Sequence, residues 1–195
     1  MVDFLYSLDV ALFYVVNHTL QNGIFDVLMP WVTDINKHWS GRITILVVWI
    51  FLLTRAGTAG RTAALLLIPS FLFSDQLNSS VLKFMFDRPR PCHVLSDVRL
   101  LVPCGSGFSF PSSHAVNNFS AAVVLAAFLP RWRWAFFGWA VLISCSRVYV
   151  GVHYPSDVLG GATVGTACGF LLVMMYRYTE THVKRWVDRR KEKNG

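Results

Sequence analysis

Long apolar stretches separated by short polar turns dominate the pattern of this 195-residue chain. Near the N-terminus, apolar positions recur with a helical period, while Asp9 and Asn17 fall elsewhere on the helical wheel. The stripe comprises Phe4, Leu5, Leu8, Ala11, Leu12, Val15 and Val16. Such a stripe is typical of a helix that lies in a membrane interface. We therefore expect an N-terminal amphipathic helix.

Five later stretches are apolar enough to be helices that cross a membrane. They are residues 43–54, 62–82, 115–129, 134–152 and 158–176. A full crossing takes about 20 residues, so the first and third must borrow flanking residues or snorkelling arginines. An earlier stretch, residues 23–32, contains Asp26 and Pro30, and the pattern does not decide whether it spans. The expected fold is an all-α membrane bundle of five or six transmembrane helices.

The chain is expected to form a single membrane-embedded domain over residues 1–195. Within it, residues 1–38 would form interfacial or short helices, 39–178 the helical core, and 179–195 a basic cytoplasmic tail. The one long connection is residues 87–110, and long loops in compact domains are usually functional. This connection is therefore the candidate functional loop.

Composition and charge support a membrane protein. Apolar residues make up 54% of the chain, above the usual range of soluble domains. The net charge of +7 does not indicate nucleic acid, because seven of the eighteen basic residues lie in residues 177–193. A basic tail after an apolar span usually marks the cytoplasmic side. We read it as a topology anchor, with binding to anionic lipid head groups as the alternative.

Charge also predicts orientation. If the tail is cytoplasmic, the turns at residues 55–61 and 130–133 are cytoplasmic too, which places eleven basic residues inside and the other seven outside. The expected localisation is the inner or plasma membrane, with several crossings. The long loop and the segments at the same level would face the periplasm or the cell exterior.

Three polar segments share that outer level: residues 83–91, 111–114 and 146–157. The first and third carry cations suited to phosphate oxygens, namely Lys83, Arg90 and Arg147. The second opens an apolar helix, whose first backbone N–H groups favour a bound phosphate, and Ser112 adds a hydroxyl. These residue types together indicate a site for a phosphorylated ligand.

His153 and Asp157 are four residues apart, so one helical turn would place the carboxylate beside the imidazole. A carboxylate in that position fixes the tautomer of the ring and stabilises the imidazolium. The other ring nitrogen then becomes a better nucleophile.

The polar segments also form a recognisable series of motifs. In chain order they read Lys83-x6-Arg90-Pro91, Pro111-Ser112-Ser113-His114 and Ser146-Arg147-x5-His153-x3-Asp157. This series resembles the three signature motifs of the type 2 phosphatidic acid phosphatase superfamily, which includes membrane lipid phosphatases. Ser113 stands where the second motif of that family usually has glycine. Its backbone N–H remains available, so the difference bears on substrate choice more than on reaction type.

The resemblance implies a role for each residue. His153 would attack the phosphorus and form a phosphohistidine, oriented by Asp157, and His114 would protonate the departing oxygen. The phosphate would be held by Lys83, Arg90, Ser112, Ser113 and Arg147. Neither a metal nor another cofactor is implied.

The implied partner is a lipid phosphate or diphosphate in the membrane, and undecaprenyl diphosphate is the first expectation by resemblance. Phosphatidylglycerol phosphate, phosphatidic acid and a lipid A phosphate are alternatives. A phosphotransferase that uses a second lipid as acceptor, and a binding protein without catalysis, are rivals from other classes. The sequence leaves the oligomeric state open.

Two further sets of residues are assigned structural roles. Cys92 and Cys104 bracket the outer loop, where a disulfide is expected in an oxidising compartment. Cys145 and Cys168 lie in apolar helices and are expected to be buried thiols. Asp75 lies inside an apolar stretch, and we expect it to form a hydrogen bond between helices.

Overall fold

Helices supply the regular structure of the computed structural model, which describes residues 2–194 and has no strand among them. The helices are α1 (Val2–Tyr14), α2 (Gly23–Thr33), α3 (Trp39–Thr54), α4 (Gly57–Leu77), α5 (Lys83–Phe86), α6 (Pro91–Val94), α7 (Ser113–Phe128), α8 (Arg133–Tyr149) and α9 (Pro155–Asn194). Two π-helical turns, Val15–Thr19 and Asn78–Leu82, extend α1 and α4, and a 3-10 turn, Pro130–Trp132, precedes α8. The all-α prediction is confirmed.

Two of the described helical segments have both the length and the composition of a membrane span. They are Gly57–Val94 and Pro155–Glu192. Other apolar helices are shorter: α3 and α7 have 16 residues each, which gives a rise of about 24 Å against about 30 Å of hydrocarbon. The number of spans therefore does not follow from helix length alone.

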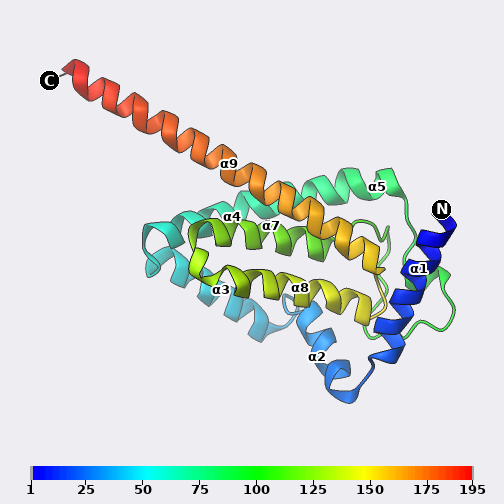
Figure 1. The fold of residues 1–195 in the computed structure, drawn as a ribbon. Helices are drawn as coiled ribbons and strands as arrows, with labels where there is room; N and C mark the ends of the chain where they lie inside the picture. The colour runs from blue at the N-terminus through cyan, green and yellow to red at the C-terminus, as the bar shows by residue number, and fades with distance from the viewer. Residues whose placement is uncertain (1, 195) are drawn as a thin grey trace.

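The helices α4, α7, α8 and α9 run side by side as the body of the bundle (Figure 1). Glycines on one face of α9 let it approach α7 closely, and they are Gly161, Gly165 and Gly169. A Cβ added at the first would lie 2.7 Å from the carbonyl oxygen of Ser112, and one added at the third would lie 2.7 Å from that of Ser120. Close backbone approach of this kind is typical of membrane helix pairs. It brings the beginnings of α7 and α9 together.

The N-terminal helix α1 lies across the end of the bundle (Figure 1). Its predicted apolar stripe is exposed, with Phe4 at 70% and Leu8 at 47% of full exposure. The buried positions on the other side include Asp9, Phe13 and Asn17, and Phe13 packs against Val148 and Tyr154. The polar positions thus face the protein and the apolar stripe faces outward, which is the arrangement expected when lipid covers the stripe.

The long loop after α5 contains α6 and a disulfide. Cys92 pairs with Cys104, as expected. Asn17 holds the loop to the bundle, because its amide donates to the carbonyl oxygens of Arg99, at 2.9 Å, and Tyr149, at 2.8 Å. The loop is therefore fixed both to itself and to the N-terminal segment.

Two smaller expectations have different outcomes. Asp75 does link helices, since its Oδ1 accepts from Nδ2 of Asn117 at 2.9 Å. Cys168 is buried as predicted, but Cys145 is exposed. The prediction for Cys145 was wrong because this residue lies on the exposed face of α8. In a membrane bundle, a residue of an apolar helix can face lipid and need not be buried in protein.

The basic tail continues α9 without a break. Residues 179–194 belong to this 40-residue helix, whose C-terminal part projects beyond the other helices (Figure 1). The cations of the tail are therefore presented on a helical surface far from the loop end of the bundle.

Candidate active site

The residues of the first motif are positioned by the end of α5 and the turn that follows. Asp87 has a positive φ of 45°, a left-handed conformation that ends α5 and turns the chain into the loop. Lys83 Nζ donates to the carbonyl oxygen of Phe108 at 2.8 Å. Arg90 Nε donates to the carbonyl oxygen of Gly107 at 3.1 Å. The two cations are thus held by consecutive carbonyl groups of the loop.

His153 lies in the short connection between α8 and α9 and is only 2% exposed. Its Nε2 is 3.2 Å from Nη1 of Arg90, and its Nδ1 is 3.3 Å from Oδ2 of Asp157. Because an arginine can only donate, Nε2 must accept and Nδ1–H must donate to the carboxylate. The ring is therefore neutral, with its free electron pair on Nε2.

The electrostatic surroundings of His153 favour the same state. Burial, and then the charges of Arg147, Arg90 and Lys83, lower the pKa of His153 well below its usual value. A neutral imidazole is the nucleophilic form. The site therefore keeps this ring neutral and surrounds it with positive charge.

Asp157 is completely buried in the first turn of α9. Pro155 begins this helix, a position at which proline is favoured. The carboxylate of Asp157 reaches back and accepts from the backbone N–H of Tyr154 at 2.8 Å, as an acidic residue does in a capping box. The local rules for starting a helix thus place this carboxylate beside His153.

The second motif surrounds the start of α7. The backbone N–H of Ser112 donates to the carbonyl oxygen of Asp157 at 3.0 Å, which joins the second and third motifs. Ser113 Oγ accepts from Nδ2 of Asn78 at 2.9 Å. The first backbone N–H groups of α7 have no acceptor within the helix and are available to an anion.

Two buried polar atoms of the site have no hydrogen-bond partner among the described residues. They are Ser112 Oγ and Arg147 Nε. Arg147 is otherwise fixed, since its Nη1 donates to Thr33 Oγ1 at 2.7 Å and lies 3.9 Å from Asp34 Oδ1. Buried polar groups are nearly always satisfied, so an unpaired donor of this kind suggests a ligand.

His114 and Ser113 line a cavity of about 540 Å³, whose wall also includes Thr33 and Asp75. Thr33 is the residue that holds Arg147, so the cavity adjoins the cationic side of the site. The structure thus gathers the predicted residues of all three motifs at the same end of the bundle.

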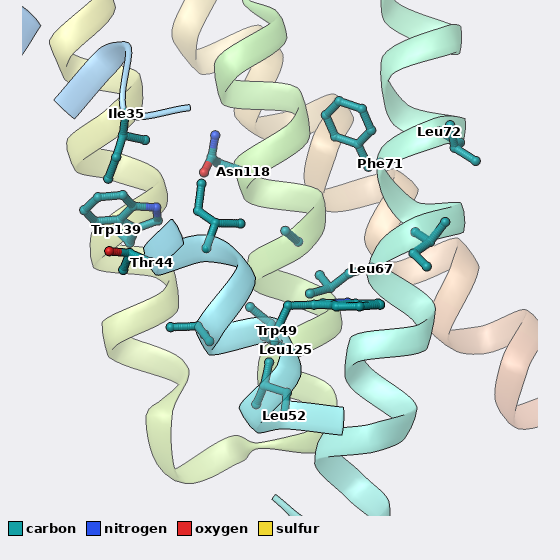
Figure 2. A pocket seen from close by; sticks show the side chains of 14 residues that line it. Ile35, Thr44, Trp49, Leu52, Leu67, Phe71, Leu72, Asn118, Leu125 and Trp139 are labelled. Carbon is teal, nitrogen blue, oxygen red and sulfur yellow. The ribbon is translucent and has the colours of Figure 1, made fainter. Parts of the chain in front are cut away.

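A second cavity, of about 650 Å³, lies beside the first and shares Asn118 and Trp139 with it. Figure 2 shows Trp49 and Leu52 from α3, Leu67 and Phe71 from α4, and Leu125 from α7 around this space. The first cavity is polar where it meets His114, and the second is almost wholly apolar. Together they suit a molecule with a polar head and an apolar chain.

Sequence reasoning missed part of the charge network. Arg88 Nη1 donates to Oδ1 of Asp157 at 2.7 Å, and its Nη2 donates to Oδ2 of Asp9 at 2.6 Å. Arg88 was passed over because the motif names only the second arginine of Arg88-Pro89-Arg90. Asp9 is 148 positions from Asp157, and nothing in the pattern of α1 indicates what it contacts. The repeated arginine was the only available signal.

A possible metal site is removed by the disulfide. Cys92, His93 and Cys104 offer ligand atoms within 4.8 Å of one another. A cysteine binds a metal as a thiolate, and the sulfur atoms of both cysteines are joined to each other. The candidate active site carries positive charge on Lys83, Arg90 and Arg147.

Comparison with known proteins agrees with this geometry. The PAP2 superfamily profile matches residues 59–180. An undecaprenyl-diphosphatase of Sulfolobus acidocaldarius is 32% identical over 168 residues, which cover 86% of this chain and 78% of that protein. A lipid A 4'-phosphatase of Porphyromonas gingivalis is 28% identical over 182 residues, which cover 88% of this chain and 72% of that protein.

A solved structure shares the fold. The PAP2-type phosphatidylglycerolphosphate phosphatase of Bacillus subtilis superposes with a TM-score of 0.67 at 28% identity, over 89% of this chain and 87% of that one. It is described as a transmembrane protein, in keeping with the apolar helices seen here. This chain therefore belongs to the PAP2 superfamily and is a membrane phosphatase that hydrolyses phosphoric esters.

Proposed function

We propose that His153 is the nucleophile of a lipid phosphatase that works through a phosphohistidine. The observation that carries this proposal is the pair of contacts made by His153, with Arg90 at Nε2 and Asp157 at Nδ1. Arg90 marks the position that a phosphate oxygen would take beside Nε2, and Asp157 would stabilise the charge that develops on the ring.

The proposed reaction has two steps. Nε2 of His153 attacks the phosphorus, the bond from phosphorus to the leaving oxygen breaks, and His114 gives that oxygen a proton. Water then attacks the phosphohistidine, the phosphorus–nitrogen bond breaks, and His114 takes a proton from the water. Lys83, Arg90 and Arg147 stabilise the oxygens of the transferring group throughout.

The unpaired atoms support a role for Ser112 and Arg147 in holding the phosphate. Ser112 Oγ and Arg147 Nε would each donate to a phosphate oxygen, which supplies the partner that neither atom has in the protein. The backbone at Ser113 would add the N–H groups at the beginning of α7. These residues bind the phosphate and leave the rest of the lipid to other surfaces.

The substrate that we propose first is undecaprenyl diphosphate, with attack on its terminal phosphorus and the lipid monophosphate as leaving group. The similarity to the undecaprenyl-diphosphatase of Sulfolobus acidocaldarius supports this choice. The two adjoining cavities support a lipid in general, because the apolar cavity shown in Figure 2 would receive part of the chain. Phosphatidylglycerol phosphate, phosphatidic acid and a lipid A phosphate are the alternatives, and two of them have relatives that act on them.

A panel of substrates tests the function. Purified protein in detergent would be given each of these four lipids, and released phosphate measured. We expect undecaprenyl diphosphate to give the highest kcat/KM and His153→Ala to release no phosphate from any of them. A wild-type rate for His153→Ala would refute the nucleophile. Phosphate that appears on an added lipid alcohol instead of in solution would identify a phosphotransferase.

We further propose five membrane spans, formed by α3, α4, α7, α8 and α9. With its 11 residues, α2 rises about 17 Å, which is too short for a crossing. Five crossings and a cytoplasmic tail place His153 outside, and the positive-inside rule supports that orientation. The disulfide supports it too, since disulfides persist in oxidising compartments.

Thiol labelling in intact cells tests the orientation. In a variant that lacks all four native cysteines, Ser96→Cys in the long loop should react with a membrane-impermeant reagent. Glu192→Cys near the end of α9 should react only after lysis. The reverse pattern would place the site in the cytoplasm and would exclude a role with outward-facing lipid diphosphates.

A further inference from the structure

A continuous line of charged groups joins the N-terminal helix to His153. Asp9 on α1 contacts Arg88 in the loop at 2.6 Å, and Arg88 contacts Asp157 on α9 at 2.7 Å. Asp157 in turn lies 3.3 Å from Nδ1 of His153. Four groups from three separate parts of the chain are thus linked in series.

Asp9 contacts α9 as well as Arg88. Its Oδ1 accepts from the backbone N–H of Ser156 at 2.9 Å, and its Oδ2 accepts from the hydroxyl of the same residue. Asp9 is 7% exposed, and an acidic group near the N-terminus of a helix is stabilised by the helix dipole. Asp9 therefore fixes α1 to the turn of α9 that carries Asp157.

Arg88 is held on several sides. Besides both carboxylates, it donates to Ser156 Oγ at 2.7 Å, and its guanidinium carbon lies 4.0 Å from the centre of the Tyr154 ring. The planar guanidinium fork suits such a multiple arrangement better than an ammonium does. The position of Arg88 is therefore well defined.

Arg88 determines how the Asp157 carboxylate is turned. Oδ1 accepts from Arg88, while Oδ2 accepts from the N–H of Tyr154 and faces His153. Without Arg88, the nearest remaining contact of Oδ1 within the described residues is Ser109 Oγ, at 3.5 Å. A completely buried carboxylate beside a neutral imidazole also needs a positive partner, which only Arg88 supplies directly among the described residues.

We propose that Arg88 and Asp9 are positioning residues of the phosphatase, which hold Asp157 in the orientation that His153 requires. This proposal rests on the nucleophilic role proposed for His153. It makes α1 part of the active site, although α1 carries none of the three motifs. The apolar stripe of this helix faces outward, so the helix that completes the charge network is also the one expected in the membrane interface.

The two residues should affect His153 in opposite directions. Removing the positive charge of Arg88 leaves the negative charge of Asp157 without its partner. The imidazolium form of His153 is then favoured, so its pKa rises. Removing the negative charge of Asp9 leaves Arg88 less compensated and lowers that pKa. Both variants leave the other charged or titratable groups around His153 unchanged. These groups are Lys83 on α5, Arg90 in the loop, His114 on α7 and Arg147 on α8.

The test is the pH dependence of kcat/KM for Arg88→Met, Asp9→Asn and the double variant. The acidic limb is the range in which kcat/KM falls as the pH is lowered and His153 becomes protonated. We expect Arg88→Met to move this limb upward by about one pH unit. Adding Asp9→Asn to Arg88→Met should move the limb back down. Each single variant should also lose about tenfold in kcat, the size of loss seen when a partner that orients a metal-bound histidine is removed from other enzymes. Arg88→Lys should keep the position of the limb and recover only part of kcat.

Asp26→Asn is the matched control. Asp26 and Arg99 form a second carboxylate–arginine pair, also at 2.6 Å, which ties α2 to the same long loop without touching Asp157. Its loss should lower thermal stability but leave the acidic limb in place. Thermal unfolding in detergent shows whether each variant is folded.

The proposal is overturned if the limb of folded Arg88→Met stays at the wild-type pH, or if Asp26→Asn moves it equally. Failure of the proposed function would look different. In that case His153→Ala would retain activity, whatever the limb of the Arg88 and Asp9 variants does.

Discussion

Adding a single methyl group at Gly161 should separate the second and third motifs. The new Cβ would lie 2.7 Å from the carbonyl oxygen of Ser112 and 2.8 Å from Cβ of Ala115, whereas ordinary contacts begin at 3.4 Å. The beginnings of α7 and α9 must therefore move apart by about 0.7 Å, because the carbonyl oxygen of Ser112 belongs to the backbone and cannot turn aside. Overpacking costs about 1–3 kcal/mol, and the better helix propensity of alanine returns about 0.5–1 kcal/mol. We expect Gly161→Ala to be destabilised by about 1–2 kcal/mol.

The effect on catalysis should be larger than the effect on stability. Ser112 N–H donates to the carbonyl oxygen of Asp157, so a displacement at Gly161 moves the turn proposed to bind phosphate relative to His153. A misplacement of about 1 Å can cost a hundredfold in rate. We therefore expect kcat to fall about tenfold or more, measured as phosphate release from a lipid phosphate in detergent micelles.

Gly169→Ala provides the control on the same helix. Its Cβ would lie 2.7 Å from the carbonyl oxygen of Ser120, a clash of the same size. Gly169 is eight residues further along α9, about 12 Å from Gly161. Its thermal unfolding should shift as much as that of Gly161→Ala, but kcat should change much less. Equal losses of kcat in the two variants would show that the loss comes from stability alone, and an unaffected Gly161→Ala would refute the reasoning.

Four further predictions concern the site. Because the pKa of His153 is lowered by burial and neighbouring cations, the acidic limb of kcat/KM should lie below pH 6.5, the usual value of a histidine; a limb above that pH would contradict the assignment. The same shift means that the unfolded chain binds a proton that folded His153 does not, so thermal stability should fall as pH drops below about 6.5. Ser112→Ala should keep the thermal stability of the wild type, since the Ser112 hydroxyl has no partner in the described protein. It should lose about tenfold or more in kcat/KM, because one charge-assisted hydrogen bond to the phosphate is removed. Lost stability with unchanged kinetics would make the residue structural. Activity should survive EDTA, because Lys83, Arg90 and Arg147 supply the positive charge; loss that magnesium restores would contradict this.

The spacing of residues along the chain was enough to locate the three motifs. It did not reveal the residues outside the motifs that contact them. His153 and Asp157 could be paired from sequence because they are four residues apart, although His153 lies just before α9 and not within its first turn. Arg88 and Asp9 could not, because their contact depends on how α1 crosses the bundle. A charged residue on the polar side of an amphipathic helix looks the same in the sequence whether it faces water or a buried arginine.

A different signal was present but unused. Gly161, Gly165 and Gly169 are four residues apart, a small-residue spacing that indicates close helix packing in membranes. The spacing shows which face of α9 is in contact but not which helix it meets. The contact of Arg147 with Thr33 was beyond reach for a similar reason, since it depends on where the end of α2 lies. Helix length also gave no firm number of spans, because α3 and α7 are shorter than the hydrocarbon thickness.

The carbonyl groups that hold Lys83 and Arg90 have a consequence for turnover. The carbonyl oxygens of Phe108 and Gly107 are neutral, so they fix the two side chains without cancelling their charge. The loop thus holds the two cationic side chains in place before an anion binds. Their conformational entropy is therefore lost on folding and not on binding. When free phosphate departs, both cations still have these carbonyl acceptors. Product release is thereby eased, in a site whose charge would otherwise retain inorganic phosphate.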